Sequence, residues 1–226
     1  MISHKHKCIF IHIPKTGGMS IYTFFNPNTV FYQDVPNYEI LFGWCPERQI
    51  HMQHATAKQL LDTGLVTKEQ WDTYYKFTFV RNPWDRAYSD YLWVQDFANV
   101  KGSFKDYLNK CKEFYNIFND HSNSQYLGDH LLPQSSFFDN KGKYSLDFIG
   151  RFENFSEDIN QILENIGKAK SFGEHQNKSN RKRDYSLFYS NSNKKLVESK
   201  FKMDIDNFGY TFQDNRQGWY SIKKIL

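Results

Sequence analysis

Cysteine is scarce in this sequence. The three cysteines, Cys8, Cys45 and Cys111, lie far apart, and none belongs to a CxxC or Cys/His spacing. A disulfide framework needs paired cysteines and a structural zinc site needs clustered ligands, so the spacing indicates neither. We expect reduced thiols in a cytoplasmic protein that binds no metal.

Long apolar runs are also missing. The N-terminal stretch MISHKHKCIFIHIPK has an apolar run of only about six residues, interrupted by His12 and Pro14, which is too short for a signal peptide. No other window approaches the roughly 18 apolar residues that a membrane-spanning helix needs. We therefore expect a soluble protein with no stable membrane insertion.

A strong charge bias is the third absence. The 226 residues carry a formal net charge of +4, which suits an anionic ligand but falls short of the dense Lys and Arg coverage of a nucleic-acid binder. We expect no nucleic-acid partner, and nothing in the sequence indicates an oligomeric state. The length and the lack of internal repeats predict one domain, residues 1–226, with peripheral tails at 1–6 and from about 214 to 226.

A strand-to-helix pattern is present three times. Each instance is a short β-rich run followed by a turn and then by residues at helical spacing: CIFIHI (8–13) before MSIYTFF (19–25), YKFTFVR (75–81) before Pro83, and LDFIGRF (146–152) before a helix over 154–166 that ends at Gly167. Strands that alternate with helices predict an α/β fold with a mainly parallel sheet. The polar stretches 27–50 and 112–143 are predicted to carry substrate contacts.

The first turn reads IHIPKTGG and has the features of an anion site. Gly17 and Gly18 allow the backbone to approach an anion, the start of the next helix directs N–H groups at it, and Thr16 and Ser20 add hydroxyls. Lys15 precedes the glycines, whereas the lysine of a Walker A loop follows them, so kinase or GTPase chemistry is disfavoured. A glycine turn that merely joins a strand to a helix is the structural alternative.

The second turn, RNPWDRAYS, offers different groups. Arg81 ends the second strand, and Ser89 follows about two helical turns later on the helix that starts at Pro83. A guanidinium fork and a hydroxyl can hold a second phosphate.

Together, FIHIPKTGGMS and FTFVRNPWDRAYSDY resemble the sulfotransferases that use 3′-phosphoadenosine 5′-phosphosulfate (PAPS), in particular the carbohydrate branch with the heparan and chondroitin sulfate enzymes. DHLLPQSSFF, LDFIGRFENFSEDINQIL, HQNKSNRKRDYSLFY and FGYTF extend the resemblance in order over nearly the whole chain. It implies a P-loop-like three-layer α/β fold, PAPS as sulfate donor, no metal, and a carbohydrate or another hydroxyl-bearing acceptor.

The resemblance also implies cofactor-binding residues. The resemblance assigns the 5′ end of PAPS to Lys15, Thr16, Gly17, Gly18, Met19, Ser20 and Ile21. It assigns the 3′-phosphate to Arg81 and Ser89, and it implies that Lys178, Ser179 and Arg181 form a further part of the cofactor pocket. Met19 departs from the family, which commonly has threonine there, so one side-chain hydroxyl is lost.

Sulfuryl transfer needs a base for the acceptor hydroxyl, and histidine is the natural candidate near neutral pH. His4 and His6 belong to the expected tail, and His12 is predicted to be a packed histidine inside the first strand. His54, before a predicted helix, resembles the family's catalytic histidine, with His51 as its rival and a structural histidine as the alternative to both. We predict catalytic roles for His54 and Lys15, and acceptor contacts for His51, His130 and Gln134.

Two other functions remain open. A P-loop nucleotide kinase shares the strand-turn-helix arrangement, but it needs a lysine after the glycines and an acidic Mg²⁺ ligand. A non-catalytic protein that binds anions or glycans on the same fold would not need a base. The presence of Lys15, Arg81, Ser89 and a candidate base favours the enzyme.

Overall fold

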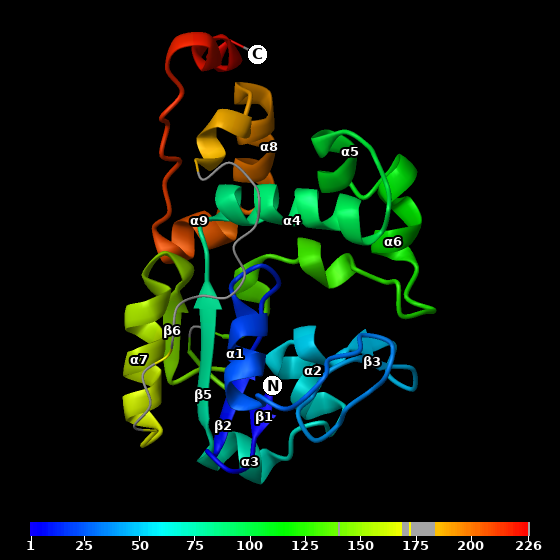
Figure 1. The fold of residues 1–226 in the computed structure, drawn as a ribbon, viewed down its shortest axis with the longest axis vertical. Coiled ribbons are helices and arrows are strands. Elements are labelled where there is room, and N and C mark those ends of the chain that lie inside the picture. Colours follow the sequence, from blue (N-terminus) through cyan, green and yellow to red (C-terminus); the bar gives the residue numbers. More distant parts are fainter. Residues whose placement is uncertain (140, 169–171, 173–183, 226) are drawn as a thin grey trace. The chain divides into compact units, whose positions relative to one another are not determined.

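The computed structural model describes residues 1–139, 141–168, 172 and 184–225 (Figure 1). These residues divide into two compact units, and the single domain that the sequence predicts for residues 1–226 stays a prediction. The first unit comprises residues 1–80, 121–124, 134–139, 141–168 and 172, and the second comprises 81–120, 125–133 and 184–225. We describe each unit by itself.

The first unit is built on a four-stranded sheet with the order β1–β2–β5–β6. Its strands are β1 (Ile2–Ser3), β2 (Cys8–Ile11), β5 (Tyr75–Val80) and β6 (Phe148–Arg151). β2, β5 and β6 are parallel, and β1 is antiparallel to β2. The three predicted strands and the mainly parallel α/β sheet are therefore confirmed.

Helices flank this sheet. They are α1 (Gly18–Phe25), α2 (Ala57–Asp62), α3 (Lys68–Thr73) and α7 (Phe155–Asn165), and a small hairpin pairs β3 (Trp44–Cys45) with β4 (Ile50–His51). α7 agrees with the helix predicted over 154–166, and Gly167 follows it in the left-handed conformation expected of a C-terminal cap.

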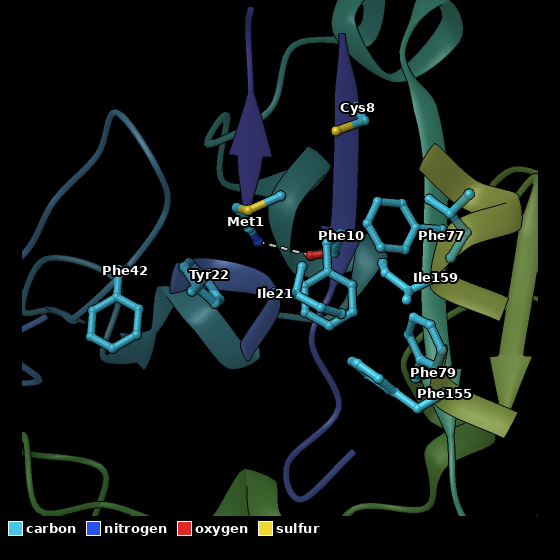
Figure 2. Close-up of a cluster of buried hydrophobic side chains, with 11 residues drawn as sticks. Met1, Cys8, Phe10, Ile21, Tyr22, Phe42, Phe77, Phe79, Phe155 and Ile159 are labelled. Atoms are coloured by element: carbon cyan, nitrogen blue, oxygen red, sulfur yellow. Dashed lines mark hydrogen bonds between the residues drawn. The ribbon is translucent and has the colours of Figure 1, made fainter. Parts of the chain in front are cut away.

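Aromatic rings from the sheet and from helices α1 and α7 form the core of the first unit. Phe10 and Phe77 stack from neighbouring strands, with ring centroids 5.1 Å apart, and Phe79 packs on Phe155 of α7 at 4.7 Å (Figure 2). The opposite strand face is also buried, since Ile9 and Ile11 are fully inaccessible. Burial on both faces explains why these strands read as continuous apolar runs.

The N-terminal residues differ from the peripheral tail predicted for 1–6. Ile2–Ser3 pair along the edge of β2, the Met1 side chain is buried, and the Met1 nitrogen donates to the Phe10 carbonyl at 2.8 Å (Figure 2). These residues pair with β2 because its backbone N–H and C=O groups on that edge need hydrogen-bond partners. The sequence did not predict this pairing, because a two-residue strand is too short to show a periodic pattern.

The second unit is helical over its described residues. It contains α4 (Pro83–Phe97), α5 (Phe104–Leu108), α6 (Tyr115–Asn119), α8 (Asn191–Lys200) and α9 (Lys202–Phe208). α4 starts as the sequence predicts, with Pro83 at its first position and the Asn82 side chain accepting from the Trp84 N–H at 3.1 Å.

The C-terminal tail predicted from about residue 214 is anchored in the second unit by Arg216. Arg216 is only 2% exposed, and its guanidinium pairs with Asp214 and donates to the Tyr189 carbonyl at 3.1 Å. A buried cation needs such partners, and here the tail itself supplies one of them. No helix in the described part of the chain has the length and apolar character needed to cross a membrane.

Candidate active site

Left-handed backbone conformations shape the turn between β2 and α1. Lys15 has a φ of 68° and Gly17 a φ of 90°. Turns of this kind can direct successive N–H groups toward one point. Gly17 is also the N-cap of α1 and has no side chain with which to cap the helix, whose first turn contains no acidic residue. The turn and the helix start therefore offer backbone N–H groups and partial positive charge to an anion.

The side chains of this turn hold it together from within. The Thr16 hydroxyl donates to the Ile13 carbonyl at 2.8 Å and is completely buried, so its proton is used inside the turn. Met19 packs against the aromatic core and Ile21 is part of it. At Thr16, Met19 and Ile21 the backbone, and not the side chain, is the group best suited to a ligand.

Strand β2 ends at Ile11, two residues earlier than predicted, so His12 lies just beyond the strand and not inside it. The His12 and Ile13 carbonyls accept from His54 and Thr16. His12 is buried, as predicted, and its ring lies against the start of α1, because a Cβ added at Gly18 would be 2.0 Å from the His12 ring. Only glycine fits there beside this ring.

His54 joins this turn from 42 residues further along the chain. Its Nδ1 lies 3.1 Å from the His12 carbonyl oxygen, and the two rings are 4.6 Å apart. A carbonyl can only accept, so a neutral His54 carries its proton on Nδ1 and its lone pair on Nε2. The structure thus brings His54, His12 and Gly18 together, with His54 in the tautomer that a general base requires.

His51 is held in the opposite way. Its Nε2 lies 3.0 Å from the Ser124 carbonyl oxygen, so Nε2 carries the proton, and the ring packs on Trp44 at 5.0 Å with only 2% of the residue exposed. This arrangement favours a supporting role for His51. Gln134 also belongs to the first unit and is completely buried at the start of the 3₁₀ turn Gln134–Ser136.

Arg81 and Ser89 belong to the second unit. Arg81 is only 3% exposed, and its guanidinium donates to Asp85 Oδ2 through Nε at 2.9 Å and Nη2 at 2.7 Å. Ser89 lies four residues after Asp85 in α4, and residues at this spacing share one helix face. Asp85 and Ser89 therefore share a face of α4, and Asp85 holds the guanidinium of Arg81, which precedes the helix.

His130 belongs to a buried polar network in the second unit. Its Nδ1 lies 2.7 Å from Asp90 Oδ1, Asp90 Oδ2 accepts from the Tyr107 hydroxyl at 2.7 Å, and the ring stacks on Trp93 at 4.9 Å. Arg86 donates to the His130 carbonyl at 2.8 Å. The sequence reasoning missed Arg86 and Asp90. Their signal was present, since both are charged residues on the buried face of α4, one helical turn apart.

Asp129 adds a second buried carboxyl to this region. Its Oδ1 is buried without a hydrogen-bond partner, and burial raises the pKa of Asp129 to about 6, with a smaller contribution from the Asp90 charge. A carboxyl in such a place is costly to ionise.

Lys178, Ser179 and Arg181, the three other predicted cofactor residues, lie outside the described residues. Over the part of the chain that is described, no group of three or more His, Cys, Asp or Glu side chains is arranged to hold a metal ion.

The comparisons with known proteins identify the family of the chain. A family model described as "Sulfotransferase family" matches residues 1–211, and the chain belongs to this family. An uncharacterized protein of Archaeoglobus fulgidus is 33% identical over 103 residues, which are 45% of this chain and 75% of that protein. No solved structure matches the chain.

Proposed function

We propose that this protein transfers a sulfuryl group from PAPS to the hydroxyl of a carbohydrate acceptor, with His54 as the base. The observation that carries the proposal is the contact of His54 with the turn between β2 and α1. The His12 carbonyl fixes the His54 tautomer, and the His12 ring packs between His54 and Gly18. A base candidate and an anion-binding turn are thereby held together in one unit.

The residues of the first turn fit the 5′-phosphosulfate. Left-handed Lys15 and Gly17 shape the backbone, α1 opens without a side-chain cap, and Lys15 supplies a cation for charge on the leaving phosphate. When bound, PAPS supplies the sulfuryl group, whose bond to the 5′-phosphate breaks as its bond to the acceptor oxygen forms.

Arg81 and Ser89 are the groups that we propose for the 3′-phosphate. Arg81 presents a fork of N–H donors that Asp85 orients, and Ser89 adds a hydroxyl one helical turn after Asp85 in α4. Lys178, Ser179 and Arg181 join this proposal through the family resemblance.

His54 Nε2 is the atom that we propose takes the acceptor proton. His54 is 9% exposed, whereas His51 is 2% exposed and has its Nε2 proton directed at Ser124, so the geometry favours His54. His51 and Gln134 are buried in the first unit, and we propose that they support the site there, while His130, buried in the second unit, keeps its proposed acceptor role through the family resemblance alone.

Calorimetry with 3′-phosphoadenosine 5′-phosphate (PAP) tests the cofactor, with ATP and GTP as competitors and with or without Mg²⁺. We expect metal-independent binding that is selective for PAP. A preference for a triphosphate would contradict the proposal and favour a kinase.

The variant His54→Asn tests the base. The Asn amide can donate to the His12 carbonyl in place of Nδ1–H but cannot accept the acceptor proton, so we expect folding and PAP binding to persist while turnover falls about 10²–10⁴-fold. The assay uses labelled PAPS and an acceptor panel. PAP binding by the wild type without turnover on any acceptor would instead identify a non-catalytic binding protein.

A further inference from the structure

The loop between α1 and β3 forms an open pocket of about 390 Å³ in the first unit. Aromatic and apolar side chains dominate its lining, and several are strongly exposed: Val30 at 68%, Tyr32 at 59%, Val35 at 56% and Tyr38 at 45%. Four large apolar or aromatic side chains exposed within nine consecutive residues mark a surface built for contact.

This pocket is braced by its own hydrogen bonds. Asn37 and Phe42 pair through their backbones at 2.7 and 3.0 Å, and the Tyr38 hydroxyl donates to Glu47 at 3.1 Å. Gly43 has a φ of 92°, and a Cβ added there would be 2.3 Å from the Val35 carbonyl oxygen. The Tyr38 ring and the loop backbone are therefore held in place before any ligand binds.

The pocket is joined to the candidate base by two routes. The Gly43 N–H donates to Gln53 Oε1 at 2.8 Å, one residue before His54, and the Gly43 carbonyl accepts from the Met52 N–H at 3.0 Å. A run of ring contacts also leads from Phe42 through Tyr22 and His12 to His54, at 5.1, 5.9 and 4.6 Å (Figure 2 shows Phe42 beside Tyr22). A ligand in the pocket would thus contact a loop that is hydrogen-bonded to Met52 and Gln53, just before the base.

The chemistry of the lining excludes a polyanion. Among the described residues no Lys or Arg lines the pocket, and the one charged side chain is Glu39, which repels carboxylates and sulfates. Tyrosine faces suit the C–H faces of sugar rings, while Asn37 and Glu39 offer amide and carboxylate groups to sugar hydroxyls. A purely apolar acceptor would bind more favourably in an enclosed cavity that excludes water, whereas this pocket is open to solvent.

We propose that this pocket binds the sulfate acceptor and that the acceptor is an uncharged carbohydrate. The inference rests on the proposed function and departs from the anionic heparan and chondroitin chains that the family resemblance suggests. Tyr32 and Tyr38 are the contact residues, and Glu39 is the residue that sets the charge preference.

Calorimetry of the full chain, with and without PAP, tests this pocket. The probes are cellotetraose, maltotetraose and chitotetraose, against an unsulfated chondroitin tetrasaccharide that carries uronate groups. We expect at least one neutral tetrasaccharide to bind at least tenfold more tightly than the uronate-containing one. Tyr32→Ala and Tyr38→Ala should each weaken that binding about tenfold.

Matched variants separate the outcomes. Tyr115→Ala removes another exposed tyrosine, in the second unit, and should leave sugar binding unchanged. Glu39→Gln should reduce the difference in affinity between the neutral and the uronate-containing tetrasaccharides. The inference would be overturned if the uronate tetrasaccharide bound more tightly than the neutral ones. It would also be overturned if Tyr32→Ala and Tyr38→Ala bound the neutral sugar as tightly as the wild type does. Binding of PAP without any of the four sugars would overturn it and leave the cofactor proposal standing. Sugar binding without PAP binding would overturn both the sulfotransferase proposal and the acceptor role, and would leave a sugar-binding pocket.

Discussion

The two turns that follow β2 and β5 occupy the same place between a strand and a helix but offer an anion different groups. After β2, left-handed residues and an uncapped helix start provide backbone N–H groups. After β5, the Asn82 side chain already caps α4 and Asp85 already pairs with Arg81. An anion at the first turn would be held by the backbone and at the second by side chains, so substitutions should act differently at the two places.

Between the two turns, the largest expected effect is at Lys15, the one side chain of the first turn that we place in the chemistry. Lys15→Ala should lower turnover about 10²–10³-fold, because charge on the leaving phosphate loses its cation. Turnover with labelled PAPS measures this. Lys7→Ala is the matched control, since Lys7 also has a positive φ, and any backbone strain from alanine is shared by both variants.

Next is Gly18, which tests whether the first turn depends on packing. Gly18→Ala should push the His12 ring and, with it, His54, so we expect a loss of about 1–3 kcal/mol in the free energy of unfolding and a tenfold or greater loss of turnover. Denaturant unfolding and the sulfate assay measure these. Gly64→Ala is the control: its φ is positive but its Cβ would meet nothing within 4 Å, so turnover should stay normal.

Arg81 tests the second turn. Arg81→Lys keeps the charge but loses the fork of donors, so we expect about tenfold weaker PAP binding, measured by calorimetry. Arg48→Lys, which alters a guanidinium bonded to the Thr63 carbonyl, should leave PAP binding unchanged. Equal PAP affinity in Arg81→Lys and wild type would show that the second turn does not hold the 3′-phosphate.

Asp129 gives the smallest expected effect on function. Its substitution tests whether an ionised carboxyl in the interior of the second unit lowers the free energy of unfolding. Its folded pKa of about 6 lies above the ordinary 3.8, so its stabilising contribution is complete below about pH 3.8 and is lost as the pH rises through about 6. We expect Asp129→Asn to gain about 1–3 kcal/mol over wild type between pH 4 and pH 8 in denaturant unfolding. Parallel pH profiles for the two proteins would contradict this.

Local patterns in the sequence predicted much of this fold. The apolar runs at 8–13, 75–81 and 146–152 became β2, β5 and β6, and Pro83 and Gly167 marked helix ends as expected. β1, β3 and β4 are two-residue strands formed by distant pairing, which leaves no periodic signal.

For the candidate site, too, the sequence predicted the local features but not the contacts between distant segments. Residue types predicted the glycine turn and singled out His54, whose roles remain predictions. The His12 carbonyl on His54, the His12 ring against Gly18 and the Asp90–His130 pair arise from tertiary packing between distant segments, which one sequence does not display.

The hydrogen bond from His54 to the His12 carbonyl also makes this histidine distinguishable by magnetic resonance. In the neutral ring, Nδ1 must behave as a protonated nitrogen and Nε2 as an unprotonated one, whereas His51, bonded through Nε2, must show the reverse. Long-range correlation of ring protons with ¹⁵N would separate the two histidines by tautomer in the resting protein, before any donor or acceptor is added.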